Sequence, residues 1–258
     1  MDSKHKIIQG GFPAKCGAAL FVLFSLLWTG TPAQIITVKQ DGTGDFTLIQ
    51  DAIDASSQGD TVLVYPGTYF ENLVIEGAGI TLGSLYLTTG DPQYKYQTVV
   101  NGNRSGSCIA IIETDNVRIA GLSLTNGSGT EGYAGTGRYI GGGLFAWLSD
   151  AVEIIHCHIY ENEVIGYGGG CDAASSTLYL SSTSIHNNYA SRFGGGIHAG
   201  HYEYTPTITF DTVNRCSIYL NYSGQGCDIS KGYSYDTLHL VLDTFSVMQP
   251  GLYHIWVI

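Results

Sequence analysis

The chain has 258 residues, a formal net charge of −11 at pH 7 and many glycine (35) and tyrosine (18) residues. Such an acidic chain has no diffuse basic field with which to bind nucleic acid or an anionic membrane surface. Only 13% of the residues are charged and 44% are hydrophobic, which excludes a disordered chain and favours a β-rich extracellular protein.

Residues 1–33 have the organisation of a secretory signal peptide. Three lysines precede an apolar run from Ala18 to Trp28, and Thr31-Pro32-Ala33 offers small residues for cleavage. The run is shorter than the roughly 20 residues that span a membrane. We expect a Sec-type signal, secretion or display at the cell surface, and no membrane insertion of the mature domain; an uncleaved anchor is the alternative.

Residues 34–258 are then expected to form one domain that begins with a cap over residues 34–58. A helix is predicted from Asp45 to Ser57, because Phe46, Ile49 and Ile53 form an apolar stripe. The segment Thr47-Leu-Ile-Gln50 resembles a capping box. Such a helix would cover the strand edges of the domain's first turn.

Coiled repeats are predicted over about residues 60–247. The early segments "GITLGSLYLTTG" and "VRIAGLSLTNG" resemble each other, with Leu85 and Leu87 matching Leu122 and Leu124. Further along, three Gly-Gly-Gly triplets begin at Gly141, Gly168 and Gly194 and are 27 and 26 residues apart. A fixed interval of this size is the signature of a solenoid.

Each later repeat also ends in asparagine. The segments "CHIYEN", "TSIHNN" and "CSIYLN" end at Asn162, Asn188 and Asn221, and the second interval is seven residues longer than the first. We attribute this surplus to an insertion at "HYEYTP". The pattern predicts a strand from Leu144 to Leu148 and a longer one from Val152 to Tyr160 in each unit.

The fold class that follows is all-β, a right-handed parallel β-helix. In the longer strand, Ile155, Cys157 and Ile159 are expected to face inward, and Ile159, Ile185 and Ile218 should share one layer. The glycines would form corners with positive φ and close backbone approach. No helix and no Lys-Ser/Thr pair follows them, which disfavours a phosphate-binding loop.

Side chains at equivalent corners should also meet. The asparagines can hydrogen-bond to each other from coil to coil. Cys157 and Cys216 share one repeat position, and Cys171 and Cys227 are expected to share another. Equivalent cysteines two coils apart, about 9.6 Å, cannot form a disulfide, so they are predicted to be buried apolar fillers.

The stretches "ITVKQDGTGDFTLIQDAIDA" and "GDTVLVYPGTYFENLVI" resemble the N-terminal segment of pectin methylesterases and of other secreted, pectin lyase-like β-helix proteins. The glycine-rich repeats resemble those of polymorphic outer-membrane-type surface proteins. The resemblance implies the β-helix fold. Pectin methylesterases use two aspartates, but this chain has Tyr160-Glu161-Asn162-Glu163 and Ser191-Arg192 where their motifs would fall. The motifs of polygalacturonases and pectate lyases are also absent.

Acidic residues supply the candidate catalytic site. A glycosidase needs two carboxylates about 5–9 Å apart, and Glu161, Glu163 and Asp172 are the candidates; a solvated acidic corner is the alternative. Asp172 and Asp228 lie in the similar contexts "GGGCD" and "GQGCD" and are candidate Ca²⁺ ligands. No other cofactor is expected.

Histidines are predicted to form no metal site. The five of them between positions 156 and 201 are spread over several coils: His156, His158, His186, His198 and His201. The repeat register places His158 beside Ser184 and not beside a second histidine.

Aromatic residues near the insertions are the candidate ligand-binding residues. They are joined by one arginine, and the set comprises Tyr133, Arg138, Tyr139, Trp147, Tyr202 and Tyr204. Loops leaving one side of a solenoid could present these rings to a sugar, although tyrosines that cover apolar sheet are the plainer interpretation.

The sequence therefore favours a secreted or surface-displayed β-helix module, an adhesin or carbohydrate-binding protein without catalysis. Its expected partner is a polysaccharide or cell-surface glycan. The alternative is a polysaccharide lyase or glycoside hydrolase with an acidic site. No cap is recognisable at the apolar end "YHIWVI": either this segment folds over the last coil or the natural chain continues, and we favour the second.

Overall fold

The computed structural model describes residues 32–132, 137–200, 203, 205–232 and 239–241. The chain divides into two units, residues 1–32 and Ala33–Ile258, and the second contains the described fold. Residues 1–31 of the predicted signal peptide and the C-terminal segment after Val241 lie outside the described residues. So do Tyr133, His201, Tyr202 and Tyr204. Within the described part, no helix is long and apolar enough to cross a membrane.

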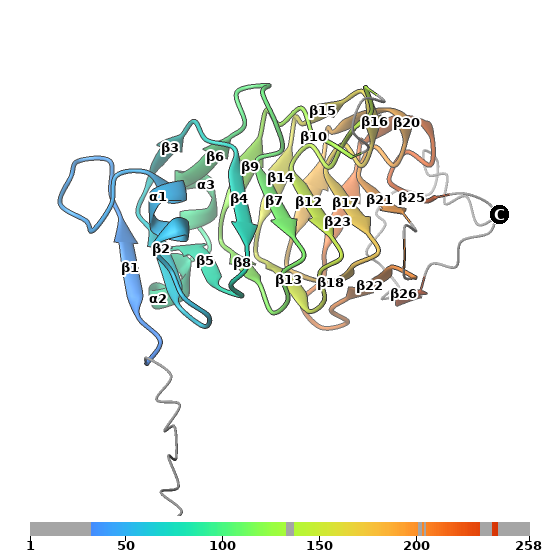
Figure 1. The fold of residues 1–258 in the computed structure, drawn as a ribbon. Coiled ribbons are helices and arrows are strands. Elements are labelled where there is room, and N and C mark those ends of the chain that lie inside the picture. Colours follow the sequence, from blue (N-terminus) through green and yellow to red (C-terminus); the bar gives the residue numbers. More distant parts are fainter. Residues whose placement is uncertain (1–31, 133–136, 201–202, 204, 233–238, 242–258) are drawn as a thin grey trace, which may run out of the picture. The chain divides into compact units, whose positions relative to one another are not determined.

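Three parallel sheets wind along the domain (Figure 1). Sheet A contains β1 (Ile35–Val38), β2 (Thr61–Val64), β5 (Thr81–Ser84), β8 (Arg118–Ala120), β13 (Val152–Ile155), β18 (Thr177–Ser181), β22 (Thr207–Phe210) and β26 (His239–Val241). Sheet B contains β3 (Gly67–Tyr69), β6 (Thr98–Asn101), β9 (Ser123–Thr125), β14 (His158–Tyr160), β19 (Ser184–His186) and β23 (Ser217–Tyr219). Sheet C contains β4 (Leu73–Glu76), β7 (Ile109–Ile112), β12 (Leu144–Trp147), β17 (Cys171–Ala174), β21 (Ile197–Gly200) and β25 (Ile229–Lys231).

A fourth sheet, sheet D, consists of short strands that lie between the asparagine and glycine corners. Its members are β10 (Thr130–Glu131), β11 (Tyr139–Ile140), β15 (Glu163–Val164), β16 (Gly166–Tyr167), β20 (Tyr189–Phe193) and β24 (Tyr222–Gln225). Strands β10 and β11, which lie between Gly127 and the first glycine triplet, pair antiparallel. The other pairs of sheet D are parallel.

From β4 onward the chain visits the sheets in the order C, A and B, and after β9 each coil adds strands of sheet D before it returns to sheet C. Each strand pairs in parallel with its equivalent in the next coil, which confirms the predicted right-handed parallel β-helix. Ile159 pairs with Ile185, Ile185 pairs with Ile218, and all three are fully buried. The predicted inward layer is therefore confirmed.

The predicted long strand from Val152 to Tyr160 is wrong. His156 has φ 55, which ends β13 and lets the chain turn from sheet A into sheet B. The turn also shifts the alternation of buried residues, so that Ile154 faces the core and Ile155 is half-buried. Cys157 and Ile159 face inward as expected.

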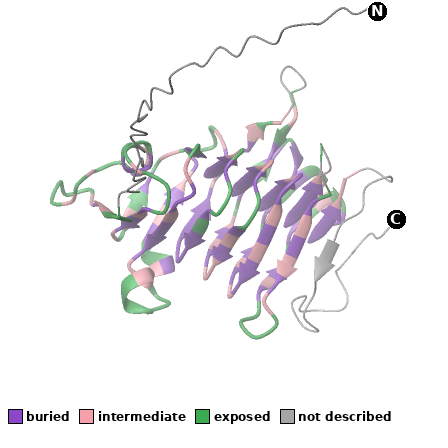
Figure 2. Cartoon of the chain, turned by 60° about the horizontal axis from the view of Figure 1, so that its bottom comes forward, coloured by how far each residue is buried: buried purple, intermediate pink, exposed green. Residues whose placement is uncertain are grey.

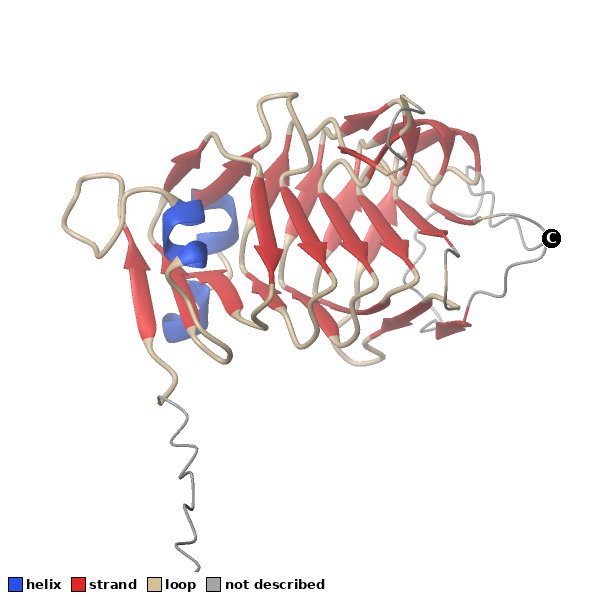
Figure 3. Cartoon of the chain, in the orientation of Figure 1, coloured by secondary structure: helices blue, strands red, loops and turns tan. Residues whose placement is uncertain are grey.

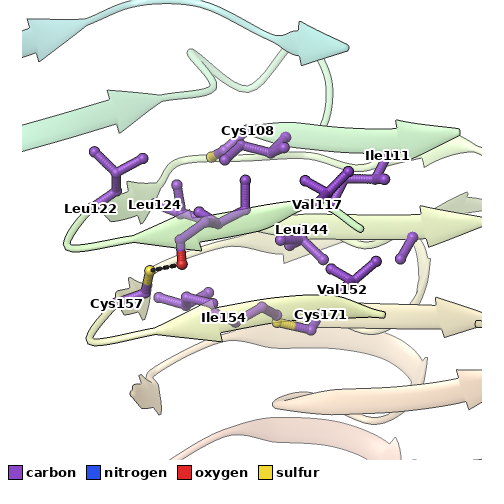
Figure 4. Packing of buried hydrophobic residues seen from close by; sticks show 14 of the residues in the cluster. Cys108, Ile111, Val117, Leu122, Leu124, Leu144, Val152, Ile154, Cys157 and Cys171 are labelled. Carbon is purple, nitrogen blue, oxygen red and sulfur yellow. Dashed lines mark hydrogen bonds between the residues drawn. The ribbon is translucent and has the colours of Figure 1, made fainter. Parts of the chain in front are cut away.

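One continuous core runs from Val38 in β1 to Ile229 in β25. Figure 2 shows the buried residues along the strands and the exposed ones concentrated at turns. Cys157, Cys171 and Cys216 are buried and have free thiols, as predicted, and so is Cys108 (Figure 4). The prediction is wrong for Cys227, which is free but only half-buried. The Cys157 thiol donates to the Ile119 carbonyl at 3.6 Å, and burial raises the pKa of Cys157 to about 11.

The glycine corners are built as predicted. Gly168 has φ +63, and a Cβ added at Gly169, whose φ is ordinary, would lie 2.5 Å from the Gly195 carbonyl oxygen. Gly142 and Gly169 donate their N–H groups to Gly168 and Gly194, each at 3.0 Å. Only residues without a side chain allow coils to approach this closely.

Next to these corners the asparagines form a buried ladder. Asn162 Nδ2 donates to Asn188 Oδ1, and Asn188 Nδ2 donates to Asn221 Oδ1, both at 3.0 Å. Each amide nitrogen also donates to a strand carbonyl of the preceding coil. The ladder continues to Asp228, whose Oδ1 accepts from Asn221 Nδ2 at 2.8 Å. The asparagine contacts expected from the sequence are confirmed.

Two details of the predicted register are wrong. Ile197 pairs with Ile229, so Cys227 stands where the third triplet has Gly195 and does not share a position with Cys171. The seven-residue surplus is divided between two corners. The number of residues between a strand position and its partner in the next coil is 26 at Ala174, 30 at Thr177 and 33 at Ser184. The corner after β22 is therefore lengthened as well as the one after β21.

Three short helices lie beside the first coils (Figure 3). Helix α1 spans Ile49–Asp54, shorter than predicted, and buries Ile49 and Ile53 as expected. The predicted capping box is wrong, because Leu48 is the N-cap and makes no side-chain bond. Instead the Glu71 carboxylate accepts from the backbone N–H groups of Ile49 and Gln50 at 3.0 and 2.9 Å.

Helices α2 (Tyr86–Thr89) and α3 (Tyr94–Gln97) occupy the connection between β5 and β6. Leu85 and Leu87 therefore belong to the α2 segment and do not match Leu124, which lies in β9, or Leu122, which lies between β8 and β9. The true partners across this interval are Leu82 and Ile119. This insertion places α3 against sheet B, next to the site described below.

Candidate functional site

The three candidate catalytic carboxylates lie in different settings. Glu161 is exposed at the corner after β14 and has φ 54. Glu163, in β15, is also exposed and accepts from Arg104 Nη1 at 2.8 Å. Asp172, in β17, is buried and contacts His198. Among the described residues, Asp172 makes no contact with Glu161 or Glu163. The catalytic roles of these three carboxylates stay predictions.

A row of polar residues crosses the outward side of sheet C. Asp172, His198 and Ser230 stand in register on β17, β21 and β25, and all three are buried. His198 Nδ1 and Asp172 Oδ2 are 2.7 Å apart. Within the described structure, His198 Nε2 and Ser230 Oγ are buried without a hydrogen-bond partner. An imidazole held by a carboxylate beside a hydroxyl is an arrangement that can carry out general base chemistry.

Aromatic residues of sheet D cover this row. Tyr167 stacks on His198 with ring centroids 4.9 Å apart, and Phe193 stacks on Tyr167 at 5.5 Å. The cover belongs to a small apolar cluster with Ile140 and Phe145. The side chain of His198 is therefore only 7% exposed, and its Nε2 atom is buried.

The candidate calcium ligands are not equivalent. Asp228 stands in the register of Gly196, whereas Asp172 aligns with His198. Burial raises the pKa of the Asp228 carboxyl. In the part of the chain that the structure describes, no three His, Cys, Asp or Glu side chains gather to hold a metal ion. Calcium binding at either aspartate stays a prediction.

The candidate ligand-binding residues that are described do not form one platform. Tyr139 is 39% exposed on β11, and Arg138 next to it is half-buried. Trp147, on β12, is half-buried and packs near Phe145, with ring centroids 6.3 Å apart. The sugar-binding role of this set, including the three tyrosines outside the described residues, stays a prediction.

The structure brings together two histidines that the sequence analysis kept apart. His158 Nε2 and His186 Nε2 are 2.7 Å apart, so the expectation that His158 has no histidine neighbour is wrong. Strand register places His158 opposite Ser184 and Tyr160 opposite His186. His158 and His186 are therefore diagonal neighbours on one face of the parallel pair β14 and β19. Side chains as long as histidine can touch across such a diagonal.

Further aromatic rings extend this contact along the outward side of sheet B. His158 stacks on Tyr160 with ring centroids 4.3 Å apart, and His186 stacks on Tyr219 at 4.8 Å. Tyr96 of α3 meets His158 edge-on at 5.3 Å and is 52% exposed. We name these five residues, Tyr96, His158, Tyr160, His186 and Tyr219, the imidazole–tyrosine strip.

The histidines of the strip are neutral at pH 7. Burial, followed by the neighbouring His186 and Lys95, lowers the pKa of His158 to about 4. Burial also lowers the pKa of His186. Two adjacent imidazoles in a half-buried setting disfavour the charged form of each other. The strip is thus an uncharged, aromatic surface with polar ring edges.

The comparisons with known proteins concern the fold. No protein-family model matches the sequence, and no curated protein matches it. Similar solved structures include pectin methylesterases from Aspergillus niger (19% identity, TM-score 0.44, covering 85% of this chain and 76% of that one) and from carrot (13%, 0.44, 82% and 82%). A mutant pectin methylesterase in complex with a hexasaccharide is also similar (15%, 0.48, 84% and 68%). The strand pairing itself defines this chain as a parallel β-helix protein.

Proposed function

We propose that this chain is a non-catalytic, carbohydrate-binding β-helix module of the cell exterior. The imidazole–tyrosine strip carries the proposal, because it lines up five aromatic and imidazole rings from α3 and three consecutive coils. The signal-like residues 1–33 support the proposed secretion or surface display. Adhesion to a glycan is the role that such a module would serve.

The chemistry of the strip suits a neutral sugar. Because the rings stack on each other, their edges are the parts left for a ligand. The hydrogen-bonding groups that remain for it are the phenol O–H groups of the tyrosines, because the imidazole nitrogens contact each other or Ser123 or are buried. Tyr96 is the most exposed ring and is available for contact with a sugar face. The histidines are uncharged at pH 7 and the chain is acidic, so a polyanionic glycan is disfavoured.

Glycan binding tests the proposal. The secreted domain would be screened on a glycan array and the hits titrated by calorimetry against Tyr96→Ala and Tyr219→Ala. Each substitution should weaken binding about tenfold or more, since aromatic anchors dominate such sites. The matched control is Tyr222→Ala, because Tyr222 is 59% exposed on sheet D and outside the strip. Absence of any glycan hit, or equal losses in all three variants, would overturn the proposal.

A second candidate function is glycan hydrolysis, and the Asp172–His198–Ser230 row favours it. Its imidazole has the oriented carboxylate and the bare nitrogen that a general base requires, although the Tyr167 cover would have to open. The array hits would therefore also be assayed for released products. If products form with the wild type and with Tyr96→Ala but not with His198→Ala, the chain is an enzyme and not a binding module.

A further inference from the structure

The two facing nitrogens of His158 and His186 have a chemical consequence beyond sugar binding. They come from β14 and β19 and lie 2.7 Å apart, with the ring planes inclined at 39°. At this distance only one hydrogen can lie between the two Nε2 atoms. One of the two imidazoles must therefore present a bare lone pair to the other.

Neighbouring contacts indicate which imidazole this is. The hydroxyl of Ser123 donates its hydrogen to the Lys95 carbonyl at 2.6 Å, so it can only accept from His158 Nδ1, 3.5 Å away. A neutral His158 with hydrogen on Nδ1 has its lone pair on Nε2. His186 then supplies the hydrogen of the contact, and its own Nδ1 is buried without a hydrogen-bond partner in the described structure.

We propose that His158 and His186 bind a divalent transition-metal ion of the Zn²⁺ or Cu²⁺ class through their two Nε2 atoms. Imidazole is a preferred ligand for these ions. Ligand binding needs no net loss of protons, because the hydrogen on His186 Nε2 can pass to Nδ1 of the same ring. Both lone pairs then point at one ion.

The geometry allows the ion to enter with small movements. Metal–imidazole bonds are about 2.0–2.1 Å long, so two ligands on one ion have their nitrogens about 3 Å apart. The present separation would have to widen by a few tenths of an ångström, which rotation of the two side chains supplies. Ser123 would hold His158 Nδ1–H, as second-shell groups commonly hold metal-bound histidines.

The electrostatic setting is mixed. Lys95 is a nearby cation that opposes the ion, whereas Glu161 lies near His186 and favours it. Water would complete the coordination, since the described residues offer no third ligand of the His, Cys, Asp or Glu type. Affinity should therefore be lower than at a four-ligand structural zinc site.

The experiment is a titration of chelator-treated protein with Cu²⁺, Zn²⁺ and, as a hard-ion control, Mg²⁺. Calorimetry should find a site for Cu²⁺ and Zn²⁺ but none for Mg²⁺. His158→Phe and His186→Phe keep a ring in the stack and should each weaken this site by at least about tenfold. The matched control is His156→Phe, because His156 is half-buried and stacks on Tyr86 instead.

Equal affinity in wild type and in both strip variants would overturn the assignment, as would the same loss in His156→Phe. If a strip variant does not fold, electron paramagnetic resonance of Cu²⁺ bound to the wild type decides. Two coordinated imidazole nitrogens support the site, and one or none refutes it. The proposal does not rest on carbohydrate binding, since metal can bind a protein that finds no glycan on the array.

Discussion

Asp228 ends the asparagine ladder at a place where the preceding coil has Gly196. Burial is the main cause that raises the pKa of this carboxyl, and hydrogen bonds from Asn221 partly oppose it. The folded protein therefore disfavours the charged form. The Asp228 carboxyl therefore contributes its full stabilisation below its unfolded pKa, which is near 3.8. This stabilisation is lost as the pH rises through the higher pKa of the folded state.

We predict that Asp228→Asn stabilises the protein at pH 7, because an amide keeps the oxygen that accepts from Asn221 and removes the buried charge. The gain should shrink as the pH falls toward 3.8, where the wild-type carboxyl takes up its proton. Urea unfolding at pH 7 and at acid pH measures the difference.

The matched control for this prediction is Asp211→Asn. Hydrogen bonds from the Asn214 side chain and from the backbone of Val213 and Asn214 lower the pKa of Asp211, so its charged form is favoured by folding. This second substitution should destabilise at pH 7. Destabilisation of similar size by both variants would mean that burial does not govern Asp228.

At the scale of the element, the start of helix α1 depends on Glu71, which lies between β3 and β4. The carboxylate of Glu71 takes up two N–H groups that the helix leaves unpaired, a role that the local sequence Thr47 to Gln50 does not fill. The start of the cap is therefore fixed by a contact between α1 and the segment before β4.

We expect Glu71→Ala to destabilise the helix by about 1 kcal/mol, the usual cost of a lost cap. Hydrogen exchange at the amides of Ile49 and Gln50 should accelerate, while the coils after β12 should keep their protection. Glu76→Ala is the control, because Glu76 is exposed at the end of β4. Identical exchange in the two variants would show that Glu71 does not hold the helix.

Local signals explain which elements could be predicted from the sequence. Glycine and asparagine corners recur at fixed intervals, so the coils and the Ile159 layer could be predicted. The break at His156 could not, because a histidine adopts φ 55 there without a glycine or asparagine to indicate it. The Glu71 cap could not be predicted from local signals either, because Glu71 is 22 and 21 positions away from the Ile49 and Gln50 amides that it accepts from.

The candidate sites follow the same logic. The contact between Asp172 and His198 could be predicted from the glycine triplets, which set both residues in one register. The contact between His158 and His186 does not follow from the repeat register, because register gives the directly opposite residues and these two are diagonal. The Tyr167 cover could not be predicted, because the strands of sheet D are short and vary between coils.

At the scale of the whole molecule, each coil is stabilised mainly by its two neighbours. Ile185 contributes a fully buried side chain between Ile159 and Ile218. In such a stack the interfaces between adjacent repeats carry the cooperativity of folding. Damage to one layer should therefore spread outward and weaken with distance.

We predict that Ile185→Ala costs about 2–5 kcal/mol of unfolding free energy, as buried isoleucine truncations do. Hydrogen exchange should accelerate most in β14, β19 and β23 and least in β1 and β2. Val213→Ala is the control, because Val213 is 81% exposed. Uniform acceleration over all coils would indicate all-or-none unfolding in place of neighbour-dependent stability.

The divided seven-residue surplus has a practical consequence. Around β22 the chain gains length twice, yet the strands on both sides keep their partners. Extra residues at these bends are thus absorbed without disturbing the interior. An epitope or fluorophore grafted beside Val213 should leave the stability of the fold unchanged. Natural variants of this architecture can lengthen at the same bends while their ladders stay intact.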